Sequence, residues 1–163
     1  MRAVAFPVLE RLRADGTSPY AAGFDGLNAP AAAKVTTAQV RREQGNLSSV
    51  PWFRGEGMTL TRDFKETVIA RVQRDPAFAQ ALLEEALTLF LAGEPDTAKR
   101  ILRDLVNATV GFETLAKKVH KSSKSLHRML SPSGNPTMDN LSAILVALKK
   151  TLRVTIRMVI KAA

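Results

Sequence analysis

The chain has 163 residues, of which 45% are hydrophobic and 24% are charged, and it contains no Cys. This composition excludes a fully disordered, collagen-like or disulfide-stapled chain, thiolate metal sites and cysteine nucleophiles. The longest apolar run without Pro, Ala143–Leu148, is too short to cross a membrane, so no membrane partner and a cytoplasmic location are expected. The formal net charge of +9 favours an anionic partner, most often nucleic acid; a basic solvated surface is the alternative.

The excess positive charge is concentrated in the last third of the sequence. Residues 109–163 carry 10 basic and 2 acidic residues, whereas residues 58–108 carry 7 basic and 8 acidic ones. Such an asymmetry is typical of a binding face rather than of general solubility.

Residues 1–57 are expected to be a weakly structured N-terminal extension. Pro and Gly interrupt them repeatedly. Short helices at Val4–Ala14 and Ala31–Gln44 are possible, but neither shows a sustained apolar stripe. Regular periodicity begins at Met58, which suggests the hypothesis that Met58 is the true start of the protein.

Residues 58–107 predict N-terminal helices. The first covers Asp63–Gln73, and Asp75 followed by Pro76 marks the beginning of the second. The second helix carries one apolar stripe, is expected to belong to the core and ends at Gly93. A third helix begins at Glu94, Pro95 and Asp96.

Residues 108–163 predict a helix-turn-helix domain with a C-terminal strand. A short helix at Phe112–Val119 is followed by a break at His120 and Lys121 and a second helix at Ser122–Leu130. A loop at residues 131–136 precedes a last helix capped by Thr137. Two short helices joined by a tight turn are the layout of DNA-binding helix-turn-helix proteins.

The second helix of this motif has an outward face rich in hydrogen-bond donors and without acidic residues. Its predicted contacts with base edges are Ser123, Lys124, His127 and Arg128. Its predicted contacts with phosphates, or residues that position the motif, are Lys117, Lys118, Lys121, Ser122 and Ser125. The alternative interpretation is a cationic amphipathic helix in a small all-α domain.

The sequence resembles the Xre, or phage-repressor-like, helix-turn-helix family and, more narrowly, the HigA-like antidote proteins of toxin–antitoxin modules. The residues that carry the resemblance are Leu60–Val68, Asp75-Pro76, Leu115–Val119, Ser125–Thr137, Leu141, Ile144 and Leu148. Two positions depart from the family pattern: His120 stands where Gly is common, and Phe112 stands where a phosphate-binding Gln is common.

The resemblance implies a mainly α fold with a five-helix Xre-type domain, to which the sequence pattern adds N-terminal helices and one C-terminal β-strand. It also implies a transcriptional regulator that binds double-stranded operator DNA and represses its own operon. As the antitoxin of a type II module, it would neutralise a RelE/HigB-like toxin.

The C-terminal segment alternates apolar and polar residues from Leu152 to Ile160, the pattern of a half-buried strand. A single strand leaves its backbone groups unpaired, so it needs a partner. A second copy in a homodimer through residues 152–160 is the preferred partner. A toxin's sheet edge and a fold-back onto the domain are the alternatives.

No pattern predicts catalysis, a cofactor or a metal site. The sequence has no Gly-rich phosphate loop or nucleophile elbow, and His120 and His127 are not spaced for one metal. Glu84, Glu85 and Phe90 are proposed instead as a surface for a basic partner. The alternative functions are a protein-binding helical adaptor and a stand-alone Xre-type regulator without a toxin.

Overall fold

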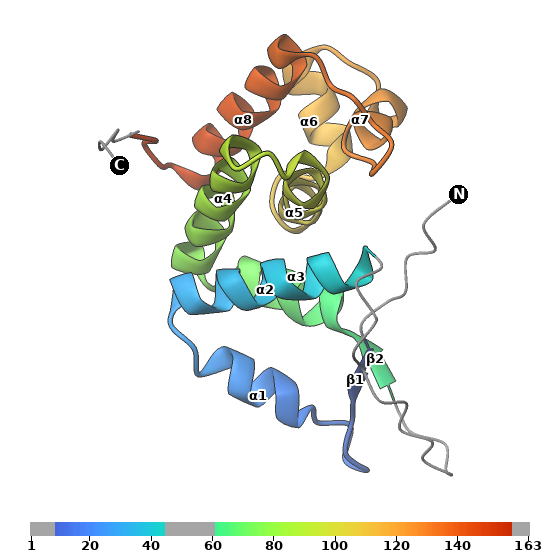
Figure 1. The fold of residues 1–163 in the computed structure, drawn as a ribbon, viewed down its shortest axis with the longest axis vertical. Coiled ribbons are helices and arrows are strands. Elements are labelled where there is room, and N and C mark those ends of the chain that lie inside the picture. Colours follow the sequence, from blue (N-terminus) through green and yellow to red (C-terminus); the bar gives the residue numbers. More distant parts are fainter. Residues whose placement is uncertain (1–8, 45–60, 158–163) are drawn as a thin grey trace.

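The computed structural model describes residues 9–44 and 61–157. Within these ranges the chain forms eight helices and two short strands, which confirms the mainly α class (Figure 1). In chain order the elements are β1 (Leu9–Arg11), α1 (Pro19–Asp25), α2 (Ala29–Glu43), β2 (Thr61–Asp63), α3 (Phe64–Arg74), α4 (Pro76–Leu91), α5 (Pro95–Ala108), α6 (Phe112–Val119), α7 (Ser123–Met129) and α8 (Met138–Leu152).

Local sequence sets the ends of the central helices. The side chain of Asp75 accepts a hydrogen bond from the backbone N–H of Phe78 at 3.1 Å, and Pro76 occupies the first turn of α4. Gly93 follows α4 with a φ of 80°, a conformation that glycine adopts without strain. The predicted starts of α4 and α5 are therefore confirmed.

The core is centred on α4 and α5, which pack along each other, and α5 also contacts α2, α3 and α6. Figure 1 shows α1 and the strands at one end of the molecule and α6–α8 at the other, with α5 between them. The large side chains that these two helices bury completely are Phe78, Leu82, Leu83, Ile101, Leu102, Leu105 and Val106. The predicted apolar stripe of α4 thus belongs to the core from Phe78 to Phe90, whereas Leu91 at its end is 74% exposed.

The expectation of weak structure across residues 1–57 is wrong for α1. The possible helix at Ala31–Gln44 is confirmed as most of α2, whereas the possible helix at Val4–Ala14 is wrong for Leu9–Arg11, which form β1. Helix α2 buries Ala32, Ala33 and Val40 and packs against α4. Because two of these three side chains are alanines, the helix comes close to its neighbour without showing the stripe of large apolar residues that marks most amphipathic helices.

Polar contacts also tie this segment to the rest of the fold. Arg41 on α2 makes two hydrogen bonds to Glu94, at 2.6 and 2.8 Å, just before α5 begins. The hydroxyl of Thr97 donates to the Gln44 side chain at 2.9 Å. A chain that began at Met58 would lack β1, α1 and α2 and would leave the faces that they cover exposed. Met58 itself lies outside the described residues, and its role as the start stays a hypothesis.

The predicted C-terminal strand is wrong at Leu152 and Arg153. Residues 154–157 have no paired strand within the single chain, and residues 158–160 lie outside the described ranges. Leu152 ends α8, and Arg153 follows in the left-handed conformation, with a φ of 55°. Residues 154–157 then run without strand pairing beside α4. Val154 packs against the core, whereas Ile156 is 37% exposed. An alternation of apolar and polar residues favours an extended chain, but a strand also requires a neighbouring backbone with which to form hydrogen bonds.

The two strands that do form pair with each other, antiparallel, with Glu10 opposite Arg62. At three residues each, they are too short to show an alternating pattern in the sequence. In the described ranges, no helix has both the length and the apolar character needed to cross a membrane.

Candidate nucleic-acid interface

Helices α6 and α7 are joined by a tight turn whose centre is His120. This residue has a φ of 52° and a ψ of 44°, which places it in the left-handed region. The backbone N–H groups of His120 and Lys121 both point to the carbonyl of Ala116, the latter at 3.1 Å. The turn thus has the left-handed geometry for which Gly is usually preferred, at a cost in backbone strain.

The start of α7 is defined by Ser122. Its hydroxyl accepts a hydrogen bond from the backbone N–H of Ser125 at 3.1 Å, so Ser122 is the predicted N-cap. Thr137 caps α8 in the same way, with its hydroxyl 3.3 Å from the N–H of Asn140. Both caps predicted from the sequence are confirmed.

Apolar side chains hold α6, α7 and α8 together. Leu115 on α6, Leu126 on α7 and Leu130 just after α7 are at most 1% exposed, and Ile144 and Leu148 on α8 are fully buried. Helix α6 contacts both α7 and α8, and these buried side chains belong to one hydrophobic core.

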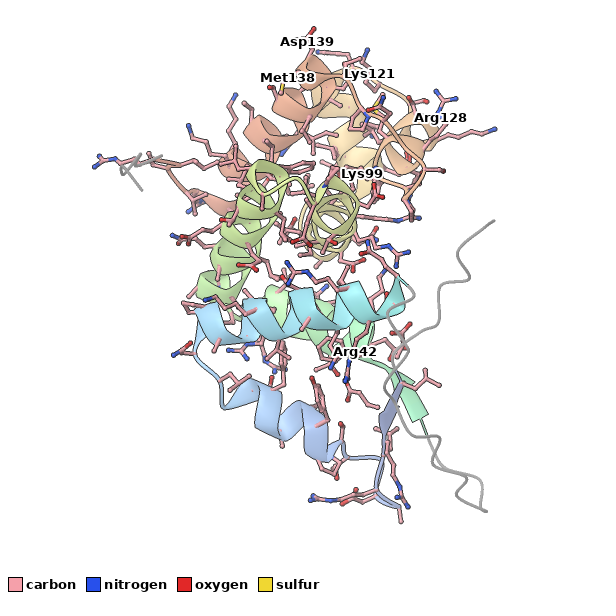
Figure 2. All side chains as sticks on the ribbon, in the orientation of Figure 1. Arg42, Lys99, Lys121, Arg128, Met138 and Asp139 are labelled. Atoms are coloured by element: carbon pink, nitrogen blue, oxygen red, sulfur yellow. The ribbon has the colours of Figure 1, made fainter. Side chains whose placement is uncertain are left out.

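The opposite face of α7 is open to solvent. Lys124 and Arg128 are exposed, Ser123 is half-buried, and this helix carries no acidic residue. Figure 2 shows Arg128 projecting from α7 away from the body of the molecule. Lys124 and Arg128 are four residues apart, so their side chains lie on the same face of the helix.

The predicted phosphate-contacting residues lie in the last turn of α6, in the turn and at the start of α7, and Lys118 donates to the hydroxyl of Thr151 on α8 at 3.4 Å. Lys117, Lys118, Lys121 and Ser122 are exposed, and Ser125 is half-buried. Figure 2 shows Lys121 at the same end of the molecule as Arg128. The turn and α7 thus present cations and hydroxyls together, which suits a negatively charged backbone.

His127 differs from the other predicted base-contacting residues. Its ring is stacked on that of Phe112, with the centroids 3.7 Å apart and the planes inclined by 20°. Phe112 is buried at the start of α6, and His127 is half-buried. One face of the imidazole is therefore covered by protein. The stacking also gives Phe112 a structural role at the start of α6.

Sequence reasoning missed Lys99, a buried cation beneath the loop that follows α7. Only 5% of this residue is exposed, and its ammonium group donates to the backbone oxygens of Pro132 and Gly134 at 3.2 and 2.6 Å. A signal was present in the sequence, because Lys99 is three and seven residues before the core positions Leu102 and Val106. A lysine in register with core positions points to a buried role.

The proposed partner surface on α4 is not one continuous face. Glu84 lies beside residues 154–157, whereas Glu85 interacts electrostatically with Arg41 on α2. Phe90 packs against the core. The structure therefore divides these three residues among different neighbours.

A cavity of about 160 Å³ lies between α2, α3 and α5 and reaches Pro132 in the loop after α7. Lys65 and Asp104 pair within it, with Nζ and Oδ1 2.6 Å apart. Burial raises the pKa of Asp104, and the charge of Lys65 partly opposes that rise. This ion pair in the lining of the cavity thus links α3 to α5. Within residues 9–44 and 61–157, no group of three or more His, Asp or Glu side chains could hold a metal ion.

Comparison with known proteins gives no indication of function, so a functional proposal depends on the geometry of this surface. No protein-family model matches the chain, and no curated protein and no solved structure is significantly similar to it.

Proposed function

We propose that this protein is a sequence-specific DNA-binding regulator that inserts α7 into the major groove. The observation that carries the proposal is the solvent-facing side of α7, where Lys124 and Arg128 are exposed on a helix with no acidic residue. This helix is capped at Ser122 and packed through Leu126, so its outward side chains stand on a defined support.

The dimensions of α7 support this docking. An α-helix with its side chains is about 10–12 Å in diameter, and the major groove of B-DNA is about 12 Å wide. Arg128 is suited to bidentate hydrogen bonding with a guanine edge, and Lys124 can donate to base or phosphate oxygens from the same face. Ser123 supplies a hydroxyl, and His127 retains only the edge of its ring for this purpose.

Phosphate contacts would set the register of the protein on DNA. Lys117, Lys118 and Lys121 project around the turn, and Ser122 and Ser125 offer hydroxyls at the start of α7. Because each lysine that neutralises a phosphate releases counterions, this part of the affinity falls steeply as salt rises.

The resemblance to the Xre family supports a more specific role as an antitoxin. On this proposal, a five-helix Xre-type arrangement within the helical fold binds an operator, represses its own operon and accompanies a RelE/HigB-like toxin. Two copies would bind half-sites about 34 Å apart on the duplex. The proposed homodimer forms through the 152–160 segment, whose residues 154–157 have no paired strand within the single chain.

The test is binding of the full chain to the DNA upstream of its own gene, against scrambled DNA of equal length, at two salt concentrations. We expect a preference of roughly a thousandfold with a steep salt slope. Equal and weak binding to both duplexes would overturn the proposal. Co-purification with the product of a neighbouring gene tests the antitoxin role separately.

A protein-binding adaptor is the second candidate, favoured by an apolar hollow between α6 and α8. It is lined by Val119, Ala143, Val146 and Ala147 and flanked by Lys118 and Lys150, and Val146 is 48% exposed. Exposed apolar surface of this kind is typical of protein contacts. An affinity for DNA with no sequence preference, together with a stable protein complex, would favour the adaptor.

A further inference from the structure

We propose that Lys99, on α5, is a positioning residue for α7 and determines how well this helix discriminates its operator. The inference rests on the proposed DNA-binding function. It adds a residue that lies outside the DNA-facing surface and acts through the loop at residues 131–136.

The contacts of Lys99 use the full donor capacity of its ammonium group. Nζ donates to the carbonyl oxygens of Pro132 and Gly134 at 3.2 and 2.6 Å, and lies 2.9 Å from the carboxylate of Asp96. An ammonium has three N–H donors, so these three partners satisfy it. With 5% of the residue exposed, Lys99 is held inside the protein, and Figure 2 shows it beside α5.

The loop that Lys99 holds is itself pressed against the end of α7. A Cβ atom at Gly134 would overlap the backbone oxygens of Arg128 and Met129, so only Gly allows this close approach. Gly134 also donates from its backbone N–H to the oxygen of Ser131 at 2.9 Å, and the Ser131 hydroxyl donates to the oxygen of Arg128 at 2.7 Å. The chain of contacts therefore runs from Lys99 through the loop to Arg128.

The Lys99 loop adds a polar restraint at the C-terminal end of α7. Leu126 is the only buried side chain between Ser123 and Met129, and the other anchors of the helix are the stacking of His127 on Phe112 and the burial of Leu130 just after it. The Ser122 cap and the His120 turn hold one end, and the Lys99 loop holds the other. Loss of the ammonium would leave two carbonyls without their donor and would free this second end.

The expected effect distinguishes positioning from direct contact. Bidentate recognition of a base edge depends on the placement of Arg128, whereas attraction to phosphates depends mainly on charge. Lys99 is buried, so it contributes little to phosphate contacts. Its loss should lower affinity for the operator and leave both non-specific affinity and the salt slope unchanged.

The experiment compares full-length wild type with Lys99→Met, which keeps an unbranched apolar side chain as far as Cε and removes the ammonium. The measurements are the Kd values for the upstream DNA and for scrambled DNA at two salt concentrations. We expect the Kd for scrambled DNA divided by the Kd for upstream DNA to fall at least about tenfold in the variant. The reason is that the proposed bidentate contact of Arg128 with a base is lost or weakened. Asp96→Asn is the matched control, since the Asp96 side chain is mostly exposed and the carbonyl contacts of Lys99 remain.

A second variant and a second measurement cover the case in which Lys99→Met folds poorly. Gly134→Ala retains Lys99 but pushes the loop away from α7, so it should reproduce the loss of discrimination. Hydrogen exchange should become faster in residues 122–130 of both variants and stay unchanged in α4.

The outcomes separate this inference from the proposed function. If wild type prefers its operator and both variants keep the same preference, Lys99 does not position α7 and only the inference fails. If wild type shows no preference, the proposed function fails. The role of Lys99 is then decided by whether hydrogen exchange in residues 122–130 is faster in the variants than in wild type. Unchanged exchange there would overturn that role.

Discussion

The imidazole ring of His127 lies parallel to the phenyl ring of Phe112, at a centroid separation of 3.7 Å, and so joins α7 to the first turn of α6. Phe112 is buried, and His127 covers it from the side of the helix that faces solvent. The pair connects the scaffold of the helix-turn-helix motif to the surface proposed to bind DNA.

Removal of Phe112 should therefore destabilise the motif strongly. We expect Phe112→Ala to lower the free energy of unfolding by about 3 kcal/mol, because a buried ring is replaced by a cavity. His127→Ala should cost about 1 kcal/mol, and a double-mutant cycle should assign a coupling of about 1 kcal/mol to the stacked pair. Urea unfolding measures all three values. Additive effects of the two substitutions would show that the rings do not stabilise each other.

Arg71 should prove essential for holding α1 in place. Its guanidinium donates to the backbone oxygens of Phe24 and Leu27 and lies 5.0 and 4.8 Å from the ring centroids of Phe24 and Phe78. We expect Arg71→Met to cost about 3 kcal/mol, because two carbonyls lose their donor in a buried setting. Limited proteolysis should then cut within residues 12–28, and urea unfolding gives the magnitude.

Arg74→Met is the control for this prediction. Arg74 pairs with Asp25 at the surface, and both side chains are more than 40% exposed. Exposed ion pairs contribute less than about 1 kcal/mol, so this variant should resist protease as well as wild type does. Equal effects of the two substitutions would contradict a special role for Arg71.

Arg128 and Lys121 should affect DNA binding in different ways. We expect Arg128→Ala to relax base preference at one operator position and to cost about 1–3 kcal/mol on specific DNA. Lys121→Ala should weaken binding to all sequences and reduce the salt slope by about one. Titrations on operator variants at several salt concentrations check both. Unchanged operator binding in both variants would show that α7 does not dock as proposed.

Because His120, between α6 and α7, has a left-handed backbone conformation, we expect glycine at this position to stabilise the turn. His120 has a φ of 52°, and its side chain is exposed, so His120→Gly removes backbone strain with little loss of packing. We expect a gain of up to about 1 kcal/mol, and a loss of similar size for the β-branched His120→Val. Thermal unfolding measures both. A destabilising His120→Gly would point to a contact of the imidazole that outweighs the strain.

Asp104 should make stability depend on pH. Burial raises the pKa of its carboxyl above the ordinary value of 3.8, so the folded protein holds this proton more tightly than the unfolded chain does. Its contribution is therefore most favourable below the ordinary pKa and is lost as pH rises through the folded pKa.

Asp104→Asn provides the measurement, because it removes this titration and leaves other carboxyl groups in place. From about pH 3 to about pH 7, the free energy of unfolding of wild type should fall relative to that of Asp104→Asn. A constant difference between the two proteins, or a rising one, would mean that pairing with Lys65 outweighs burial.

Local signals predicted the parts of this protein that depend on neighbouring residues in the chain. Asp75, Ser122 and Thr137 are followed within three residues by the backbone N–H groups that they cap, so the starts of α4, α7 and α8 could be found without the fold. The outward face of α7 was also predictable, because helical periodicity separates Lys124 and Arg128 from Leu126.

Other features were beyond local reasoning. Helix α2 packs through Ala32 and Ala33, small residues that give little periodic contrast, and its burial depends on a partner, α4, more than thirty residues away. The C-terminal alternation predicted a strand, but no neighbouring backbone pairs with residues 154–157. Strand formation depends on such a partner, which the pattern of one segment does not reveal.

The sequence by itself thus determined the helical class, the helix-turn-helix layout and the donor-rich face of α7, because caps, turns and periodicity act over a few residues. Only the tertiary structure decided that residues 19–43 belong to the fold, that His127 stacks on Phe112, and that Lys99 holds the loop after α7. These contacts join residues that lie far apart along the chain, and the burial of Lys99 is favourable only once the loop brings its carbonyl oxygens to the ammonium.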